Sequence, residues 1–362
     1  MVAVAQPSPT DPFDRPDLTV LVLAAGGTVS QGILKALAAG GLRCRVLAAC
    51  VSPLAAGLHW AERAMLSPLA ADPDFAPWLF ELCRSERIDA VLAGQENVLD
   101  RLAGLAQELR DRTGVVALVA PPASLAIARD KLETCQWLQS EELPYPAFAA
   151  ADDDVAVEQL VRRFAFPLWA KPRCASGSRG GFRVDDAEAL AEVRRKPGYL
   201  LQEFLGADDD EYSAGVLSDL EGVPRGVIVL KRRLAFGLTV AAEAGDYPDA
   251  EAVARAVAAA LAAPGPCNVQ MRRHRGRFVP FEINLRFSST TPVRVALGFP
   301  EVEAALRHFV LNEPLPPLPR VTRGVAVRHW EESYPDPDQI ERLRAGKTIA
   351  GASRPPRRGF SS

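Results

Sequence analysis

The sequence predicts an α/β region in the first third of the chain and an α+β region after it. Two observations carry this prediction. Short apolar runs alternate with helical segments up to about residue 120, which is typical of a parallel sheet with crossover helices. Beyond about residue 200, longer strands follow one another in pairs across tight Gly-containing turns, as in antiparallel hairpins. The first region is therefore expected to be Rossmann-like, and the second to contain antiparallel sheets.

The α/β region begins with the apolar run Leu18–Ala25, which suits a strand buried on both faces. Gly26 and Gly27 end that strand, and a helix is predicted over Ser30–Ala39. The other elements predicted here are strands at Arg43–Ala49, Ala90–Ala93 and Val115–Val119 and helices around Pro77–Arg87 and Val98–Arg112.

The α+β region begins after Pro121-Pro122, where Ser124 is a candidate cap for one helix running to about Glu142. The stretch Phe236–Glu243 contains a glycine and is predicted to be a loop. The other predicted elements are short strands at Leu168–Arg173, Gly181–Val184 and Tyr199–Phe204, a helix near Asp186–Arg195, the hairpins Glu211–Ser218/Arg225–Arg232 and Pro266–His274/Arg277–Leu285, and between these hairpins the helix Asp249–Ala263.

The composition is that of a globular protein: 48% of the 362 residues are apolar and 24% are charged. The net charge of −3 favours neither nucleic acid nor an anionic membrane as a partner. No run of about 18 apolar residues and no signal-peptide pattern is found, so we expect a cytoplasmic protein. The six cysteines are scattered and are expected to be free thiols.

The last predicted hairpin carries polar side chains that converge. Glu282 and Asn284 are two residues apart, so both lie on one face of the sheet, and Gln270 lies on the partner strand. Three oxygen donors on paired strands suit Mg²⁺, which completes its shell with phosphate oxygens and water. Arg286, two residues further along, could neutralise a transferred phosphoryl group. The alternative is a solvated face of an amphipathic hairpin.

A lysine and a glycine-rich loop end one of the short strands. The segment Lys171–Gly181 reads KPRCASGSRGG, and backbone N–H groups in such loops can cover phosphates while basic side chains supply charge. The spacing differs from that of a P-loop, and an ordinary hairpin turn is the alternative. Eleven residues is long for such a turn, so we favour a phosphate-covering flap.

An extended segment follows the last of the short strands. Gln202–Leu205 could offer backbone groups to an adenine, and a carboxylate nearby could bind ribose hydroxyls. The acidic run 208–210 is better explained as a solvated turn than as a metal site, because neighbouring side chains in an extended turn diverge.

These three features in this order resemble the ATP-grasp superfamily, and most closely its carbamoyl-phosphate-synthetase-like branch, with a single module. The resemblance implies a Rossmann-like pre-ATP-grasp domain at residues 18–120 and a two-subdomain ATP-grasp fold at 121–320, divided into an A subdomain at about 121–200 and a B subdomain at about 201–320. A disordered N-terminus at 1–17 and a C-terminal extension at 321–362 complete the expected organisation.

The resemblance also assigns residues. The metal set matches Gln270, Glu282 and Asn284, and the catalytic residues match Arg286 and Lys171. The acid near the ribose or the metal matches Glu203 or Glu211. The residues expected to bind the nucleotide are Lys131, Lys171, Ser176, Gly177, Ser178, Gly180, Gln202, Glu203, Phe204, Leu205 and Glu211.

The implied reaction is ATP-dependent activation of a small-molecule carboxylate as an acyl phosphate, which an amine or similar nucleophile then attacks. ATP and Mg²⁺ are the expected cofactors, with Mn²⁺ as a substitute. Dimers are common in the superfamily, which favours a homodimer. Arg232, Arg233 and Arg294 are candidates for the cation that binds the substrate carboxylate, although a solvated strand end also explains the first two.

Two other functions remain open. A non-catalytic, ATP-binding regulatory protein would keep the fold without the reaction. An NAD(P)-binding oxidoreductase would use the Rossmann-like start, but the loop Gly26–Gly32 departs from the G-x-G-x-x-G spacing.

Overall fold

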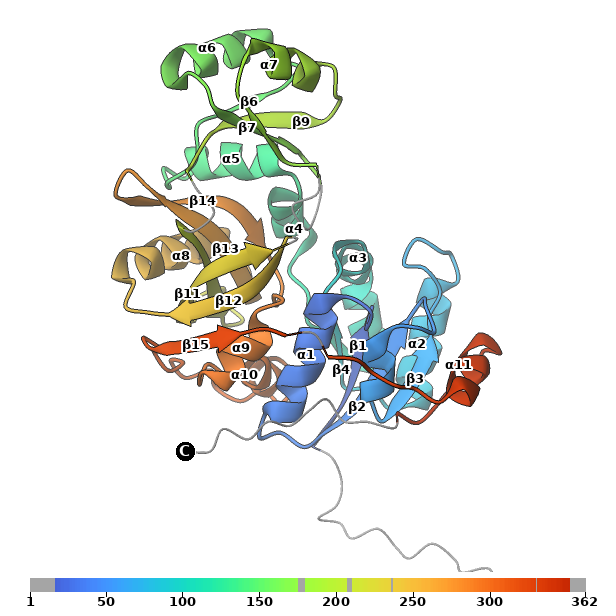
Figure 1. The fold of residues 1–362 in the computed structure, drawn as a ribbon. Helices are drawn as coiled ribbons and strands as arrows, with labels where there is room; N and C mark the ends of the chain where they lie inside the picture. The colour runs from blue at the N-terminus through green and yellow to red at the C-terminus, as the bar shows by residue number, and fades with distance from the viewer. Residues whose placement is uncertain (1–16, 175–179, 207–209, 236, 330, 352–362) are drawn as a thin grey trace, which may run out of the picture.

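The computed structural model describes residues 17–174, 180–206, 210–235, 237–329 and 331–351. The chain forms a parallel sheet and two antiparallel sheets, as the sequence predicts (Figure 1). The expected disorder of residues 1–16, and the flap residues Ser176, Gly177 and Ser178, lie outside the described residues. In the described part, no helix is both long and apolar enough to cross a membrane.

The first sheet has the strand order β3-β2-β1-β4-β5, and all its pairs are parallel. Its central strand, β1, is fully buried and almost entirely apolar, as expected for a sheet covered on both faces. The sequence did not indicate β3, a four-residue edge strand, nor the short helix before it. The elements are β1 (Leu18–Leu23), α1 (Thr28–Ala39), β2 (Cys44–Cys50), η2 (Ala56–Trp60), β3 (Arg63–Leu66), α2 (Phe75–Ser85), β4 (Ala90–Ala93), α3 (Glu96–Thr113) and β5 (Val116–Ala117).

The predicted helix from Ser124 to Glu142 is wrong, because the helix is interrupted at Asp130. Asp130 has an extended backbone (φ −97°, ψ 116°), so α4 (Pro122–Arg129) ends before it and α5 (Lys131–Ser140) begins after it. The Asp130 side chain caps the second helix by accepting a hydrogen bond from the Leu132 N–H at 2.9 Å. The interruption places Lys131 at the start of a helix instead of in the middle of one.

The second sheet is small and lies over α5 (Figure 1). Its strand order is β6-β9-β7-β8, and its pairs are antiparallel. The sequence indicated neither β6 nor α6. The elements are β6 (Phe148–Ala150), α6 (Asp154–Phe164), β7 (Leu168–Pro172), β8 (Phe182–Val184), α7 (Ala187–Arg194) and β9 (Tyr199–Glu203).

The third sheet has the order β14-β13-β10-β11-β12-β15. The predicted loop Phe236–Glu243 is wrong over most of its length, because β12 begins at Leu238; Phe236 itself lies outside the described residues. The sequence Leu-Thr-Val-Ala-Ala contains β-formers, and only the glycine before it suggested a loop. The elements are β10 (Glu211–Ser218), β11 (Pro224–Ala235), β12 (Leu238–Ala244), α8 (Pro248–Leu261), β13 (Gly265–His274), β14 (Arg277–Asn284), α9 (Thr291–Ala296), α10 (Glu301–Phe309) and β15 (Gly324–Val327).

The C-terminal segment returns to the first sheet. After β15 the chain passes α1 and forms α11 (Pro337–Arg344), and Ile349 then forms an antiparallel bridge to Ala64 of β3 (Figure 1). Leu343 and Ile349 are buried in the same apolar cluster as β1 and α1. The two ends of the described chain therefore belong to one core.

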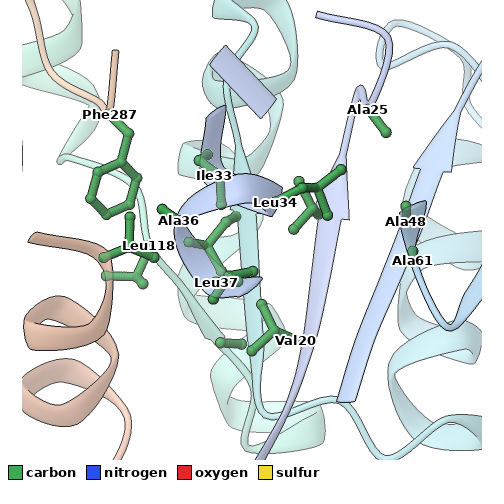
Figure 2. Packing of buried hydrophobic residues seen from close by; sticks show 14 of the residues in the cluster. Val20, Ala25, Ile33, Leu34, Ala36, Leu37, Ala48, Ala61, Leu118 and Phe287 are labelled. Carbon is green, nitrogen blue, oxygen red and sulfur yellow. The ribbon is translucent and has the colours of Figure 1, made fainter. Parts of the chain in front are cut away.

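Phe287, just after β14, joins the third sheet to the first. Its ring is 2% exposed and belongs to the apolar cluster of Val20, Ile33 and Leu118 (Figure 2). Because this cluster draws on segments from both ends of the chain, it fixes the third sheet against α1.

Phe287→Ala should lower the free energy of unfolding by about 3–5 kcal/mol, the usual cost of removing a buried phenylalanine ring. Urea denaturation followed by fluorescence measures it. Val325→Ala, at a side chain 69% exposed, is the control and should change stability by less than about 0.5 kcal/mol. A loss below about 1 kcal/mol for Phe287→Ala would contradict the packing described here.

Candidate functional site

The third sheet has one apolar face and one polar face. On β10, Tyr212, Ala214 and Val216 belong to the apolar core with α8, and Glu211 and Ser213 lie on the opposite face. The polar face continues across β13 and β14. Cross-strand pairing places Gln270 opposite Glu282 and Asn268 opposite Asn284. The predicted metal residues are therefore neighbours on one face. The period-two spacing places Glu282 and Asn284 there, and a register shift between Gln270 and Met271 brings Gln270 opposite Glu282.

A chain of hydrogen bonds runs through these residues. Gln270 Nε2 donates to Glu282 Oε1 at 3.3 Å, and Asn284 Nδ2 donates to the same oxygen at 3.1 Å. The amide oxygens face guanidinium groups: Arg232 Nη2 lies 2.5 Å from Gln270 Oε1, and Arg286 Nη2 lies 3.0 Å from Asn284 Oδ1. Glu282 is thus a half-buried carboxylate held between two amides.

A cavity of about 340 Å³ lies between the second and third sheets, in front of Glu282. That volume falls in the usual range of small-molecule sites. Its wall is apolar in part, through Trp169, Phe204 and Phe281, and cationic in part, through Lys131 and Lys171. The complete lining is Lys131, Trp169, Lys171, Pro172, Gly181, Gln202, Glu203, Phe204, Leu205, Glu211, Leu234, Ala235, Gly237, Gln270, Arg272, Phe281 and Glu282.

Lys171 is a buried cation in this wall. Its side chain comes from β7, and its Nζ donates to the Phe281 carbonyl oxygen at 3.0 Å. Burial lowers the pKa of Lys171 to about 8; Lys131 and Arg272 nearby also lower it, while Glu282 acts in the opposite direction. A buried ammonium group with cationic neighbours is a favourable place for a polyanion.

The segment Gln202–Leu205 lines the cavity, but two of its side chains are engaged elsewhere. Gln202 Nε2 donates to Cys135 Sγ of α5 at 2.9 Å, and Glu203 Oε1 accepts from the Ala147 N–H at 3.0 Å. These bonds fix the course of the segment, so its backbone groups and the Phe204 ring are what it offers to a ligand.

Glu211 also lines the cavity, but its charge is balanced. Arg232 forms an ion pair with one carboxylate oxygen, and Arg272 Nη2 lies 2.9 Å from the other. Arg232 therefore bridges Glu211 and Gln270 along the polar face. Its neighbour Arg233 is exposed and lies outside the cavity lining.

Arg294 packs against the polar face of the third sheet, beside Ser213 and Asn268, and lies outside the cavity lining. The side chain is 1% exposed, lies 3.4 Å from Glu301 Oε2 and donates to Asn268 Oδ1. Burial lowers the pKa of Arg294 and raises that of Glu301, although each is opposed by the other's charge. Gly215 leaves room for the guanidinium, because an added Cβ would lie 2.2 Å from Arg294 Nη1.

The far end of the flap is held by close contacts. Gly180 has φ +75°, and its carbonyl oxygen accepts a hydrogen bond from Tyr199 Oη at 3.2 Å. Gly181 lines the cavity beside Trp169. Glycine at residue 180 is required by the positive φ.

Sequence reasoning missed two residues that line the cavity, Trp169 and Arg272, and two whose contacts lie outside its lining, Glu96 and Arg328. Trp169 and Arg272 are each two positions from a residue that was identified, so strand alternation could have found them. Glu96 gave no signal: it begins α3 and lies 2.7 Å from Arg286 Nε, joining the first sheet to the third. Arg328, after β15, donates to the backbone oxygens of Ser289 and Thr239 (3.4 Å for the latter), and burial lowers its pKa.

The oxygen donors on this face suit a metal ion that needs few carboxylate ligands. Among the described residues, no group of three or more His, Cys, Asp or Glu side chains could hold one. Glu282, with amide oxygens available from Gln270 and Asn284 if these side chains turn, still fits Mg²⁺, because that ion needs only one or two carboxylates when phosphates share its shell.

These features define the fold: the chain has the ATP-grasp fold, with its cavity between two antiparallel sheets. An N5-carboxyaminoimidazole ribonucleotide synthetase solved as an ADP complex is similar, with a TM-score of 0.68 and 16% identity over 86% of this chain and 81% of that one. The synthetase of the same name from Thermus thermophilus has a TM-score of 0.64 and 22% sequence identity, over 84% of this chain and 81% of that one. The biotin carboxylase domain of Hydrogenobacter thermophilus 2-oxoglutarate carboxylase has a TM-score of 0.64 and 15% sequence identity, over 82% of this chain and 70% of that one.

Among curated proteins, the carbamoyl phosphate synthase large chain of Corynebacterium glutamicum is 27% identical over 224 residues. The match covers 56% of this chain and 20% of that protein, so the chain spans about a fifth of the relative's length. It agrees with the resemblance to the carbamoyl-phosphate-synthetase-like branch. No protein-family model matches the chain.

Gly215→Ala should lower the free energy of unfolding by about 1–3 kcal/mol, because the new methyl group must displace the buried Arg294 guanidinium. Gly104→Ala is the matched control: Gly104 lies inside α3 with no atom within 4 Å of an added Cβ, so the same change should stabilise by roughly 0.5–1 kcal/mol. Equal effects in chemical denaturation would contradict the close approach of Arg294 to β10.

Proposed function

We propose that this chain is an ATP-dependent ligase, which activates the carboxylate of a small molecule as an acyl phosphate for attack by an amine or similar nucleophile, with release of ADP and phosphate. One observation supports this best: a single cavity combines two buried lysines, an apolar wall beside an extended segment, and a carboxylate flanked by amides. The solved relatives include an ADP complex of a synthetase and a MgADP and bicarbonate complex of a biotin carboxylase domain.

The nucleotide is assigned to the cavity by chemistry. The apolar rings of Trp169 and Phe204 and the backbone of Gln202–Leu205 suit an adenine, and the ammonium groups of Lys131 and Lys171 suit phosphates. Ser176, Gly177, Ser178 and Gly180 are assigned to the flap over those phosphates. Glu203 and Glu211 are the two candidates for the acid near the ribose.

Mg²⁺, or Mn²⁺ in its place, is assigned to Glu282, with Gln270 and Asn284 as further ligands. The metal supplies charge neutralisation at the phosphates. The protein's own residues align the reactants and stabilise developing charge, which is most of the work in phosphoryl transfer. Lys171 holds an ammonium group at the phosphate position, and Arg286 is kept in place by Glu96 and Asn284.

The acceptor carboxylate is assigned to Arg286 and Arg328, whose guanidinium groups both donate to backbone oxygens of the segment after β14. Within the described residues, the Arg328 guanidinium donates to backbone oxygens, and these neutral partners leave its charge available for an anion. Arg232 is a second candidate, but it already pairs with Glu211. Arg233 is a weaker candidate because it is exposed, and Arg294 is a weaker candidate because its charge is already paired with Glu301.

Glu282→Gln should reduce ADP release by about 10²–10³-fold, because the carboxylate that holds the metal is lost. The assay supplies MgATP, a panel of small carboxylic acids and hydroxylamine, which traps acyl phosphates as hydroxamates. Glu243→Gln, at an exposed position of β12, is the matched control and should keep wild-type turnover.

Near wild-type turnover in Glu282→Gln would remove this residue from the metal site. A wild-type chain that binds MgATP but releases no ADP with any acid would instead favour the regulatory alternative.

ATP affinity should fall as the pH rises through about 8, because Lys171 then loses the proton that makes it a cation. Further ionisation of the terminal phosphate over this range adds negative charge and would strengthen binding, so it does not produce the fall in affinity. Isothermal titration calorimetry measures the affinity for ATP from about one pH unit below this pKa to about one unit above it. Proton uptake on ATP binding is expected near pH 8. Lys171→Met should bind ATP more weakly and without this pH dependence; a wild-type profile that is flat across pH 8 would contradict the assignment.

A further inference from the structure

Two phosphate-facing lysines of the cavity come from separate elements. Lys171 belongs to β7, whereas Lys131 is the first residue of α5. Both side chains are buried and both line the cavity. Lys131 stands at a helix terminus, directly after the interruption at Asp130, so its position depends on the contacts that hold this terminus.

The end of β7 supplies that support through the backbone. The Lys131 N–H donates to the Arg173 carbonyl oxygen at 3.0 Å, and the Arg173 N–H donates to the Gly198 carbonyl oxygen at 2.8 Å. The first bond fixes the start of α5 to the end of β7, and the second fixes the same residue to the loop before β9.

The side chains of Asp130 and Arg173 close the connection. Arg173 Nε lies 3.0 Å from Asp130 Oδ1 and 2.9 Å from Oδ2, and Arg173 Nη2 lies 2.7 Å from Oδ2. Such a fork-like contact is stronger and more directional than a single hydrogen bond. The carboxylate also caps α5 through the Leu132 N–H, so one side chain orders both the helix and the strand end.

We propose that Asp130 and Arg173 form a positioning pair that holds Lys131 at the phosphate end of the cavity by locking the start of α5 to the end of β7. Neither residue is among those that line the cavity, so the pair acts through Lys131. The inference rests on the proposed function, in which Lys131 contacts the phosphates of ATP.

The test compares binding of MgATP and of adenosine, which lacks phosphates, to the full chain. Asp130→Asn keeps a good helix cap and removes the charge of the pair. It should weaken MgATP binding about tenfold, in the range of coupling between contacting charged groups, and leave adenosine binding within about twofold. Arg173→Gln should do the same. Asp154→Asn is the matched control, because Asp154 pairs with Arg194 on α7 away from the cavity and its loss should change neither affinity.

A second background tests the route. In Lys131→Met, which itself loses phosphate-dependent affinity, adding Asp130→Asn should have no further effect beyond about twofold. The proposal is overturned if Asp130→Asn leaves MgATP binding unchanged, weakens adenosine equally, or costs as much in Lys131→Met as in the wild type. A wild-type chain that binds adenosine but gains nothing from the phosphates would instead overturn the proposed function, and the role of the pair with it.

Discussion

The site is organised around a charge that is costly to bury. Lys171 lies between two sheets with its ammonium group against a backbone oxygen, and burial lowers its pKa to about 8. Desolvation disfavours the charged form of such a group unless an opposite charge approaches. Lys131 and Arg272 line the same cavity and increase its positive potential. A polyanion bound here would relieve this repulsion, and ATP is the polyanion that the rest of the cavity fits.

The surrounding structure restrains the residues that face this charge. Glu282 is held by two amides, each amide by an arginine, and one of those arginines by Glu96 of the first sheet. Phe287 follows shortly after Asn284 of that network along the chain and packs into the core of the first sheet. The third sheet, the site and the first sheet are therefore connected by both polar and apolar contacts, which favours a rigid arrangement of the candidate site residues.

Some of the site could be predicted from the sequence because strand geometry has a short period. The spacing of Glu282 and Asn284 predicts a shared face whatever the tertiary structure. Gln270 lies opposite Glu282 because the register shifts between Gln270 and Met271, a bulge that the sequence did not indicate. Arg294 could not be assessed in this way. Its place against the polar face of the sheet depends on Gly215, about 80 residues away, which has no side chain to displace it. The interruption at Asp130 was also missed, since α4 and α5 together read as one helix; the aspartate there both ends one helix and caps the next. Long-range partners such as Glu96 and Arg328 leave no local pattern.

The central claim, that ATP binds between the second and third sheets, can be tested by photolabelling the full chain with 8-azido-ATP and mapping the modified peptide by mass spectrometry. The adenine should label residues 199–206 or the neighbouring strand around Trp169, and unlabelled ATP should protect both. Labelling at the loop Gly26–Gly32 after β1 would place the nucleotide on the Rossmann-like sheet and contradict this account.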